Sequence, residues 1–333
     1  MPKRICWKKG MRLTDEVLRA SDNCTAEFIS QTLSLAACGR FGLIPALKPF
    51  QLQLSITKGF VDVEALTCEG ITRGGQLISA DFDTKFTNTL DSRIQIPRIE
   101  DEQEVLLTII AHPDDLKETS DGYLEQNYSF ALVSPKAGLN PYSLPIARLI
   151  YEDGWREDNT NFVPPCLSVA AHGKYIQLFQ QFIQMMQSID ETTRKQSQSA
   201  ASTALGIFWP AVREQLIEAA TLQSSMSPQQ LQACVQKVVS AFVVGCELDE
   251  LIDLEDAQMY RNYSIAGYSY RMAYTRIKQG LGICYNINEK VEKFGLLVKE
   301  EPKPTPPPPP EPEPRKPTPP PADPRRSWLG KSI

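Results

Sequence analysis

Hydrophobic and polar residues alternate along most of the first half of the chain. The alternation is clearest in four segments, at 50–71, 75–86, 104–112 and 125–134. β-Branched and aromatic residues at every second position are typical of half-buried strands. No long helical pattern lies between these segments, as a parallel sheet would require. We therefore expect an antiparallel β-sandwich shell over residues 1–162, with one or two helices between 14 and 37.

A helical period replaces the alternation from about residue 163. Large apolar side chains recur at spacings of four, three, four and three residues, at Tyr175, Phe179, Phe182, Met186 and Ile189. Such a stripe places a broad apolar face on one helix. Because the face is wider than packing inside one chain requires, we expect these residues to form a bundle interface within the chain and between copies.

Three more helices are expected, over 204–222, from Ser227 onward and over 265–280. The start at Ser227 is marked by an N-cap serine, a proline at the first helical position, and Gln230 at the capping-box position. Short connections between helices favour antiparallel neighbours. The sequence therefore predicts a helical bundle over residues 163–298.

Proline dominates the last part of the chain. Fourteen of the 26 prolines fall between Pro302 and Pro324, mixed with charged residues and threonine. Such a composition cannot bury enough apolar surface to offset the entropy of ordering, so we expect a disordered arm over residues 299–333. Trp328 and Leu329, close to its end, are candidate residues for docking to a partner.

Composition and charge narrow the class of protein. The 333 residues suffice for two ordinary domains, and a net charge of −5 gives no general attraction to nucleic acid or to an anionic membrane. The positive N-terminus has no apolar run behind it, and the run at 238–246 is half of the ~20 residues that a spanning helix needs. We expect a cytoplasmic protein without membrane insertion. None of its eight cysteines is spaced as a metal-binding pair, and we expect them to be reduced.

The sequence AHPDD at 111–115 resembles the metal-binding start of zinc-dependent deacetylases that act on N-acetylglucosamine conjugates. In that family the histidine and the second aspartate, here His112 and Asp115, bind zinc together with a downstream histidine. The chain has one other histidine, His172, which lacks the second histidine of the family's pair. A three-ligand zinc site is therefore hard to assemble. We expect a strand that turns at Pro113-Asp114, and no metal, cofactor or catalytic centre.

Two other patterns favour contacts with protein rather than chemistry. An acidic run at 247–256 lacks the spacing of a calcium loop, so we expect a helix end or a face for a basic partner. Tyrosines between 260 and 274 alternate with Arg261 and Arg271. The preceding acidic run opposes nucleic-acid binding, and packing in the bundle or across subunits is expected instead.

Two passages match motifs of one known family in their order. Residues 7–13 read W-x-x-G-M-x-L, and residues 144–149, LPIARL, are followed by Asp158 and by FVPPCL at 162–167. These passages resemble those of TssK, the trimeric baseplate subunit of bacterial type VI secretion systems. In that family the second passage ends the β shell and enters the helical bundle. The resemblance covers about residues 1–297.

The resemblance implies an α+β chain in which the shell binds the baseplate wedge formed by TssF and TssG. The bundle is expected to trimerise. Wedge contact is expected at Trp7, Gly10, Met11 and Leu13. TssK proteins usually continue into a C-terminal head that binds the inner-membrane complex, and here the proline-rich arm stands in its place.

The resemblance thus predicts a non-enzymatic homotrimer that links the wedge to a membrane anchor at the cytoplasmic face of the inner membrane. The arm, with Trp328 and Leu329, is the candidate for contact with that anchor. Two alternatives remain open: a phage-like receptor-binding or tail adaptor protein, and a zinc deacetylase that uses His112 and Asp115. The N-terminal motif could also serve local packing.

Overall fold

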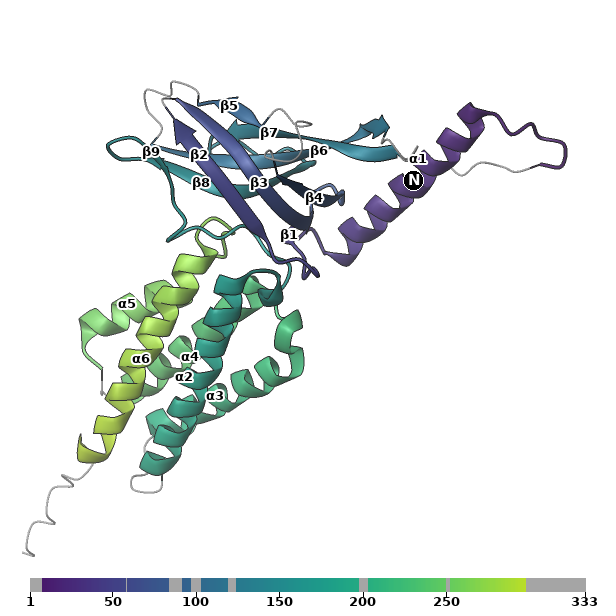
Figure 1. Cartoon of the computed structure of the whole chain (residues 1–333). Coiled ribbons are helices and arrows are strands. Elements are labelled where there is room, and N and C mark those ends of the chain that lie inside the picture. The colour runs from purple at the N-terminus through teal and green to yellow at the C-terminus, as the bar shows by residue number, and fades with distance from the viewer. Residues whose placement is uncertain are drawn as a thin grey trace, which may run out of the picture. The chain divides into compact units, whose positions relative to one another are not determined.

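The computed structural model (Figure 1) describes residues 8–57, 59–83, 92–96, 103–118, 124–197, 203–249 and 252–297. The chain divides into two units, Met1–Val298 and Lys299–Ile333, and all of the described residues belong to the first. The expected arm, its residues Trp328 and Leu329, and Trp7 of the N-terminal motif lie outside the described residues.

The strands of the described ranges form two antiparallel sheets. The first contains β1 (Gly42–Leu43), β2 (Gln51–Thr57), β3 (Phe60–Ile71), β4 (Leu77–Asp83) and β5 (Arg93–Gln95), arranged around the long β3. The second has the order β7 (Leu124–Val133), β6 (Glu104–Glu118), β8 (Ser143–Tyr151) and β9 (Trp155–Glu157). The sequence therefore predicted the antiparallel arrangement correctly.

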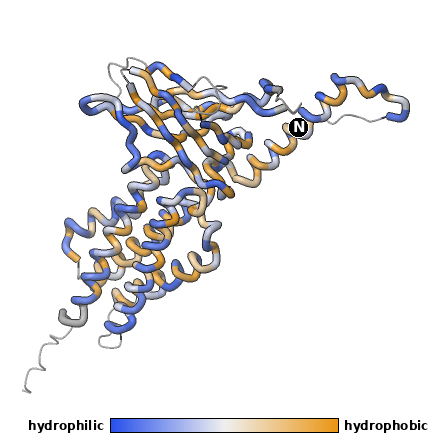
Figure 2. Tube along the Cα trace, in the orientation of Figure 1, coloured by the Kyte–Doolittle hydropathy of each residue, from blue (hydrophilic) through white to orange (hydrophobic). Residues whose placement is uncertain are grey.

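The two sheets pack face to face as a sandwich (Figure 1). The rings of Phe82 on β4 and Phe130 on β7 lie 5.6 Å apart, and the Tyr128 hydroxyl of β7 accepts a hydrogen bond of 3.1 Å from the Ser79 backbone of β4. Apolar residues of both sheets belong to one hydrophobic core (Figure 2). Area removed from water on the two inner faces is what holds the layers together.

A β-bulge explains why the buried residues of β3 change phase. Val61 and Val63 are buried at odd positions, whereas Leu66 and Cys68 are buried at even positions. The register with β2 shifts where Leu54 pairs with Val63. One extra residue in β3 lets both halves of the strand face the core, which strict alternation would not allow.

The AHPDD sequence does not end its strand, contrary to our expectation. β6 continues to Glu118, and its register against β7 shifts between His112 and Leu116. Pro113 has no backbone N–H to give to the ladder. The strand therefore bulges over these residues and resumes pairing rather than turning back.

The second half of the unit is helical, as expected. The helices are α2 (Gly173–Ser197), α3 (Thr203–Leu222), α4 (Pro228–Leu248), α5 (Leu254–Ser264) and α6 (Ala273–Leu297), with short 3-10 turns η1 (Val169–Ala171) and η2 (Gln223–Ser225). They pack with their apolar faces inward (Figure 2). With the sandwich before it, this bundle confirms the α+β class.

α4 starts as its sequence predicted and forms the centre of the bundle. The Ser227 side chain accepts a hydrogen bond from the Gln230 backbone, and the Gln230 side chain accepts one from the Ser227 backbone, which completes a capping box. By length and composition alone α4 could span a membrane, but 56% of its most apolar window is buried inside the protein. Core packing accounts for that apolar character.

The helix expected over 265–280 is wrong at both ends. α5 ends at Ser264, and α6 begins at Ala273 and continues to Leu297. Asp253, inside the acidic run, caps α5 by accepting a hydrogen bond of 2.8 Å from the Asp256 backbone. The acidic residues therefore mark a helix start, where negative charge favours the helix dipole.

Candidate functional site

The passage FVPPCL at 162–167 joins the shell to the bundle. Leu43 of β1 forms an isolated parallel bridge with Cys166, and its N–H donates a 2.7 Å hydrogen bond to the Pro165 carbonyl. The Leu167 N–H returns a 2.9 Å bond to the Leu43 carbonyl. A Cβ at Gly42 would overlap the backbone of Pro165. Only glycine permits this close approach.

A buried ion pair lies beside the junction and joins two parts of the second family-like passage. Arg148 of β8 donates to Asp158 through Nε at 3.0 Å and through Nη2 at 2.5 Å. Both residues are buried. The guanidinium also lies 5.6 Å from the centre of the Phe162 ring, and the second carboxylate oxygen of Asp158 accepts from the Asn161 backbone at 3.1 Å. The motif residues therefore fix the exit from the sandwich.

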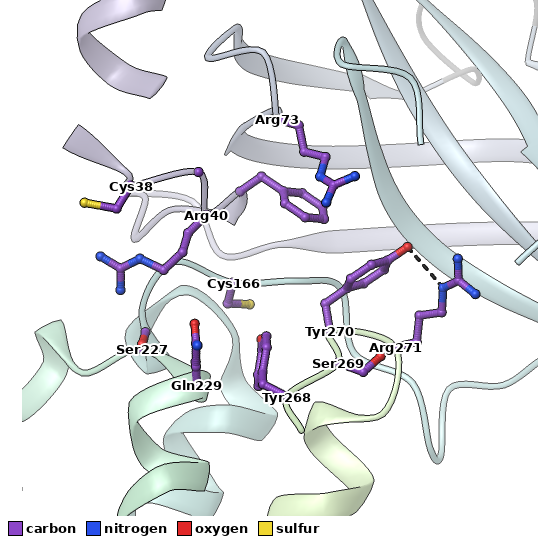
Figure 3. Close-up of a pocket in the computed structure, with 12 residues that line it drawn as sticks. Cys38, Arg40, Arg73, Cys166, Ser227, Gln229, Tyr268, Ser269, Tyr270 and Arg271 are labelled. Carbon is purple, nitrogen blue, oxygen red and sulfur yellow. Dashed lines mark hydrogen bonds between the residues drawn. The ribbon is translucent and has the colours of Figure 1, made fainter. Parts of the chain in front are cut away.

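A cavity of about 570 Å³ lies at the same junction (Figure 3). Its walls come from the turn after α1 (Asp15–Ala36), the β3–β4 turn, the start of α4 and the segment before α6. Arg40, Arg73 and Arg271 line it, together with Phe41, Tyr268 and Tyr270. No local pattern in the sequence indicates the arginines at 40 and 73, because they come from segments far apart in the chain.

The N-terminal motif begins with a tight turn. The Met11 N–H donates a 3.1 Å hydrogen bond to the Lys8 carbonyl, and Gly10 has φ +86°. This is the left-handed conformation that glycine adopts at the third position of a turn. Met11 and Leu13 are exposed, Leu13 to 69%. Gly10 thus has a local role, and the two apolar side chains are available at the surface.

α1 contacts the sandwich through small residues. The Ser30 hydroxyl donates a 2.9 Å hydrogen bond to the Gly74 carbonyl, and a Cβ at Gly75 would overlap Ser30 and reach Ser34. Ser30 and Ser34 are four residues apart and so lie along one line of the helix. Ser30 is the buried residue of this 22-residue helix.

Large apolar residues of α1 lie away from this line of serines. Leu18, Ile29 and Leu35 are exposed, Leu35 to 79%. Leu18 and Ile29 are eleven residues, about three turns, apart and lie along one line. A helix that packs with serines and exposes leucines carries an apolar surface suited to a protein partner. Figure 1 shows α1 extending away from the strands.

The apolar stripe of α2 lies inside the bundle of one chain. Tyr175, Phe182, Met186 and Ile189 are fully buried, and Phe179 is partly buried against the same core. The stripe meets α3 and α6 rather than an open surface. Its width therefore gives no support to a contact between copies, and a trimer interface at these residues stays a prediction.

α5 carries apolar residues away from the bundle core. Ala257, Tyr260 and Tyr263 are buried on its inner side, whereas Leu254 and Ile265 are 83% and 81% exposed. A groove of about 880 Å³ lies between α5 and α6, and Leu254 is among the residues that line it. The lining of this groove is mixed, with Leu254 and Met259 beside polar residues such as Gln258.

The residues of the zinc hypothesis bind other partners. His112 Nε2 lies 2.7 Å from the Ser129 hydroxyl, and the Asp115 carboxylate accepts from Asn127 Nδ2 at 2.7 Å. His172 Nδ1 accepts a 3.2 Å bond from the Lys174 backbone. In the described parts of the chain no three histidine, cysteine or acidic residues are grouped as a metal would require.

The thiols of the described core have no reactive character. Cys68, Cys166, Cys234, Cys246 and Cys284 are buried and free. Burial raises the pKa of Cys68, Cys234, Cys246 and Cys284 to about 12, far above the range in which a thiolate forms. These cysteines serve as small apolar core residues.

Solved structures share this architecture, although no protein-family model and no curated protein matches the sequence. TssK from the type VI secretion system of EAEC, in complex with a nanobody, matches with TM-score 0.54 and 14% identity over 81% of this chain and 68% of that chain. A crystal structure of TssK gives 0.54 and 12% over 86% and 69%. A chain of the cryo-electron microscopy structure of the TssK-TssF-TssG baseplate subcomplex gives 0.53 and 12% over 87% and 99%.

At identities this low, the likeness concerns the fold. The shared region extends over more than four fifths of the chain and so includes both shell and bundle. The resemblance noted in the two sequence passages is confirmed at that level. This chain has the fold of TssK, the baseplate protein of type VI secretion systems.

Proposed function

We propose that the protein is a non-enzymatic structural adaptor of a type VI secretion baseplate. In this proposal a homotrimer links the wedge proteins TssF and TssG to a membrane anchor at the cytoplasmic face of the inner membrane. The observation that carries the proposal is the shared fold, which extends over 99% of a chain from a TssK-TssF-TssG subcomplex. A fold alone does not determine function, so the surfaces of this chain supply the further support.

The wedge contact is placed on the N-terminal motif and on α1. Met11 and Leu13 are exposed directly before the helix, Leu18 and Ile29 extend the apolar surface along one line of it, and Leu35 is exposed about a third of a turn away. Together they span more than 20 residues of continuous sequence. Such a helix can lay its apolar side into a groove of a partner, which buries it at low cost because the helix is already formed.

The trimer contact is placed on the bundle, as the division into a shell at 1–162 and a bundle at 163–298 implies. The α2 stripe is occupied within the chain, so the exposed residues of α5 are the better-supported surface. Leu254 begins this helix, Ile265 directly follows its last residue, and both side chains are exposed. Around a threefold axis each copy would present these side chains to a neighbour.

The deciding experiment is co-purification with TssF and TssG of the same system. The wild-type chain should form a trimer by light scattering and bring down both wedge proteins. The double variant Leu18→Glu/Ile29→Glu should lose the wedge proteins and keep the trimer. The variant Leu254→Glu/Ile265→Glu should lose the trimer. Burying a new carboxylate in either contact costs several kcal/mol, so each loss should be close to complete.

A matched control comes from Leu47, which is fully exposed in the loop before β2. Leu47→Glu adds the same charge at an apolar surface position outside both surfaces, and it should change neither assembly. A wild-type chain that stays monomeric at micromolar concentration and does not bind TssF or TssG would contradict the proposal. Loss of wedge binding in Leu47→Glu alone would refute the placement on α1.

A further inference from the structure

The junction cavity is a separate feature from the apolar surfaces assigned above. It is about 570 Å³ in volume, which lies within the range of pockets that bind small ligands or short peptide segments. Its walls combine shell and bundle, because Arg73 comes from the β3–β4 turn and Arg271 from the segment before α6. A ligand here would contact both parts of the unit.

The cavity is positive although the chain as a whole is negative. Arg40, Arg73 and Arg271 line it, and none of its lining residues is acidic. Among the described residues these three arginines form no ion pair, unlike Arg93, Arg148, Arg156, Arg213 and Arg261, each of which has an acidic partner. Three guanidinium groups without a carboxylate favour an anionic ligand.

Arg40 and Arg271 are each held by one hydrogen bond that leaves the terminal guanidinium nitrogens available to a ligand. Arg40 donates through Nε to the Ala37 carbonyl at 3.2 Å, and Arg271 donates through Nε to the Tyr270 hydroxyl at 3.1 Å. In both cases this hydrogen bond holds the Nε end of the aliphatic part of the side chain in place. The two terminal nitrogens, which form the usual fork toward a carboxylate, stay directed elsewhere.

Aromatic rings fix the positions of Arg73 and Arg271 relative to each other. The Arg73 guanidinium lies 5.4 Å from the centre of the Phe41 ring. Phe41 meets Tyr270 edge to face, with centres 5.3 Å apart and planes at 70°. Arg271 lies 5.6 Å from the Tyr270 ring. The chain Arg73, Phe41, Tyr270, Arg271 therefore crosses from shell to bundle as one packed row.

The directions of the three arginines favour a ligand with more than one anionic group. In Figure 3 the side chain of Arg40 points away from Arg73 and Arg271, toward the opposite side of the cavity. The first turn of α4, represented by Gln229, lies between the two sides and adds the positive end of a helix dipole. A ligand with two or more spaced carboxylates can contact both sides at once.

We infer that this cavity binds a short acidic segment of a partner protein in an extended conformation. Carboxylates on alternate residues of an extended peptide lie about 7 Å apart on one side of it, so an acidic peptide can present one carboxylate to Arg40 and others to Arg73 and Arg271. The partly exposed rings of Tyr268 and Tyr270 provide contact area for the peptide between these carboxylates.

The test measures fluorescence anisotropy of a labelled octapeptide with glutamate and glycine in alternation, added to the full chain at low salt. The same peptide with glutamine in place of glutamate is the ligand control. Arg73→Gln/Arg271→Gln should weaken binding about tenfold or more. Arg194→Gln is the matched protein control, since Arg194 is exposed in the last turn of α2 and should change binding less than about twofold.

Arg271→Lys separates charge from fork geometry, and it should weaken binding less than Arg271→Gln. The melting temperature of each variant, compared with that of the wild type, shows whether the fold is intact. The inference is overturned if the glutamate peptide does not bind, if the glutamine peptide binds equally, or if Arg194→Gln weakens binding as much as the double variant. It is also overturned if inorganic phosphate or a single-stranded oligonucleotide binds more tightly than the peptide through the same arginines. Trimer formation and wedge binding can be intact in every one of these outcomes, so failure here does not count against the proposed function.

Discussion

Arg148 and Asp158 form a buried, two-bond ion pair between the end of β8 and the passage that leads into the bundle, with nitrogen to oxygen distances of 3.0 and 2.5 Å. Asp158 is 3% exposed and Arg148 is 8% exposed. Removing charge from water is costly, so such a pair stabilises a particular geometry more than it stabilises folding as a whole. Here that geometry is the exit of the chain from the sandwich.

Breaking this pair should therefore destabilise the protein strongly. Arg148→Ala leaves a buried carboxylate without its partner, and we expect a loss of about 3 to 5 kcal/mol in the free energy of unfolding. Asp158→Asn should have a similar effect. The exposed pair of Arg156 and Glu152 is the control, and Arg156→Ala should cost at most about 1 kcal/mol. Denaturant unfolding measures all three. A loss at Arg148 no larger than that at Arg156 would contradict the role given to the pair.

The sequence predicted those features of the fold that depend on neighbouring residues. Alternation over 50–71 and 104–112 indicated strands, and the Ser227 capping box indicated the start of α4, because each signal lies inside the element that it describes. The bulge after His112 and the short helix α5 were missed. A bulge depends on how two neighbouring strands pair, which the sequence of one strand does not determine. The helix α5 is too short to show a clear helical period of apolar residues.

The candidate sites were predicted less well for a related reason. Arg40, Arg73 and Arg271 meet only after the sandwich and the bundle have folded, so no local spacing indicates them. The α2 stripe from Tyr175 to Ile189 has the pattern of a helix interface, but a sequence cannot tell whether the interface is filled by the same chain. Structure answers that question in favour of the chain's own helices.

His172 should make the stability of the protein depend on pH. Burial lowers the pKa of His172 from 6.5 to about 4, with a smaller effect of the Lys174 charge. The folded state therefore keeps this imidazole neutral, while the unfolded state takes up a proton as the pH falls below 6.5. Stability from this group is complete above pH 6.5 and is lost toward pH 4, by up to about 3 kcal/mol.

His172→Asn isolates this effect from the titration of carboxylates. The asparagine oxygen can accept the Lys174 N–H bond that Nδ1 accepts in the wild type, but it does not titrate. Denaturant midpoints at pH 7.5, 6 and 5 should fall more steeply for the wild type than for the variant. Parallel curves would show that His172 does not remain neutral in the folded protein.

Gly75 should be essential for the packing of α1 against the sandwich. It has φ +82°, and an added Cβ would lie against the Ser30 carbonyl closer than atoms can approach. Gly75→Ala should therefore displace α1, in addition to about 1 kcal/mol of backbone strain. Gly59→Ala is the control, because Gly59 has φ +88° and open space around its missing side chain.

The rate of trypsin cleavage at Arg19 reports how firmly α1 packs against the sandwich. We expect Gly75→Ala to accelerate this cleavage several-fold and Gly59→Ala to leave it near the wild-type rate, although both variants have similar backbone strain. Equal rates in the two variants would mean that the small-residue contact between Ser30 and Gly75 does not hold the helix. Wedge binding measured on the same proteins would then show whether the packing of α1 against the sandwich matters for assembly.

The segment from Lys299 onward should be dispensable for folding and needed for recruitment. Among the residues whose burial the structure describes, Val291 is the last in the hydrophobic core, and fourteen prolines with few apolar residues lie between Pro302 and Pro324. A chain ending at Val298 should keep its oligomeric state, and its melting temperature should change by less than about 2 °C, since no core area is lost.

Recruitment to the membrane anchor should weaken in the truncated chain and also in Trp328→Ala/Leu329→Ala, which keeps the full length. Fluorescence microscopy of the tagged protein in its own cells measures recruitment. Failure of the truncated chain to fold would show that the segment belongs to the core, and intact recruitment in both variants would place the anchor contact on the shell or the bundle.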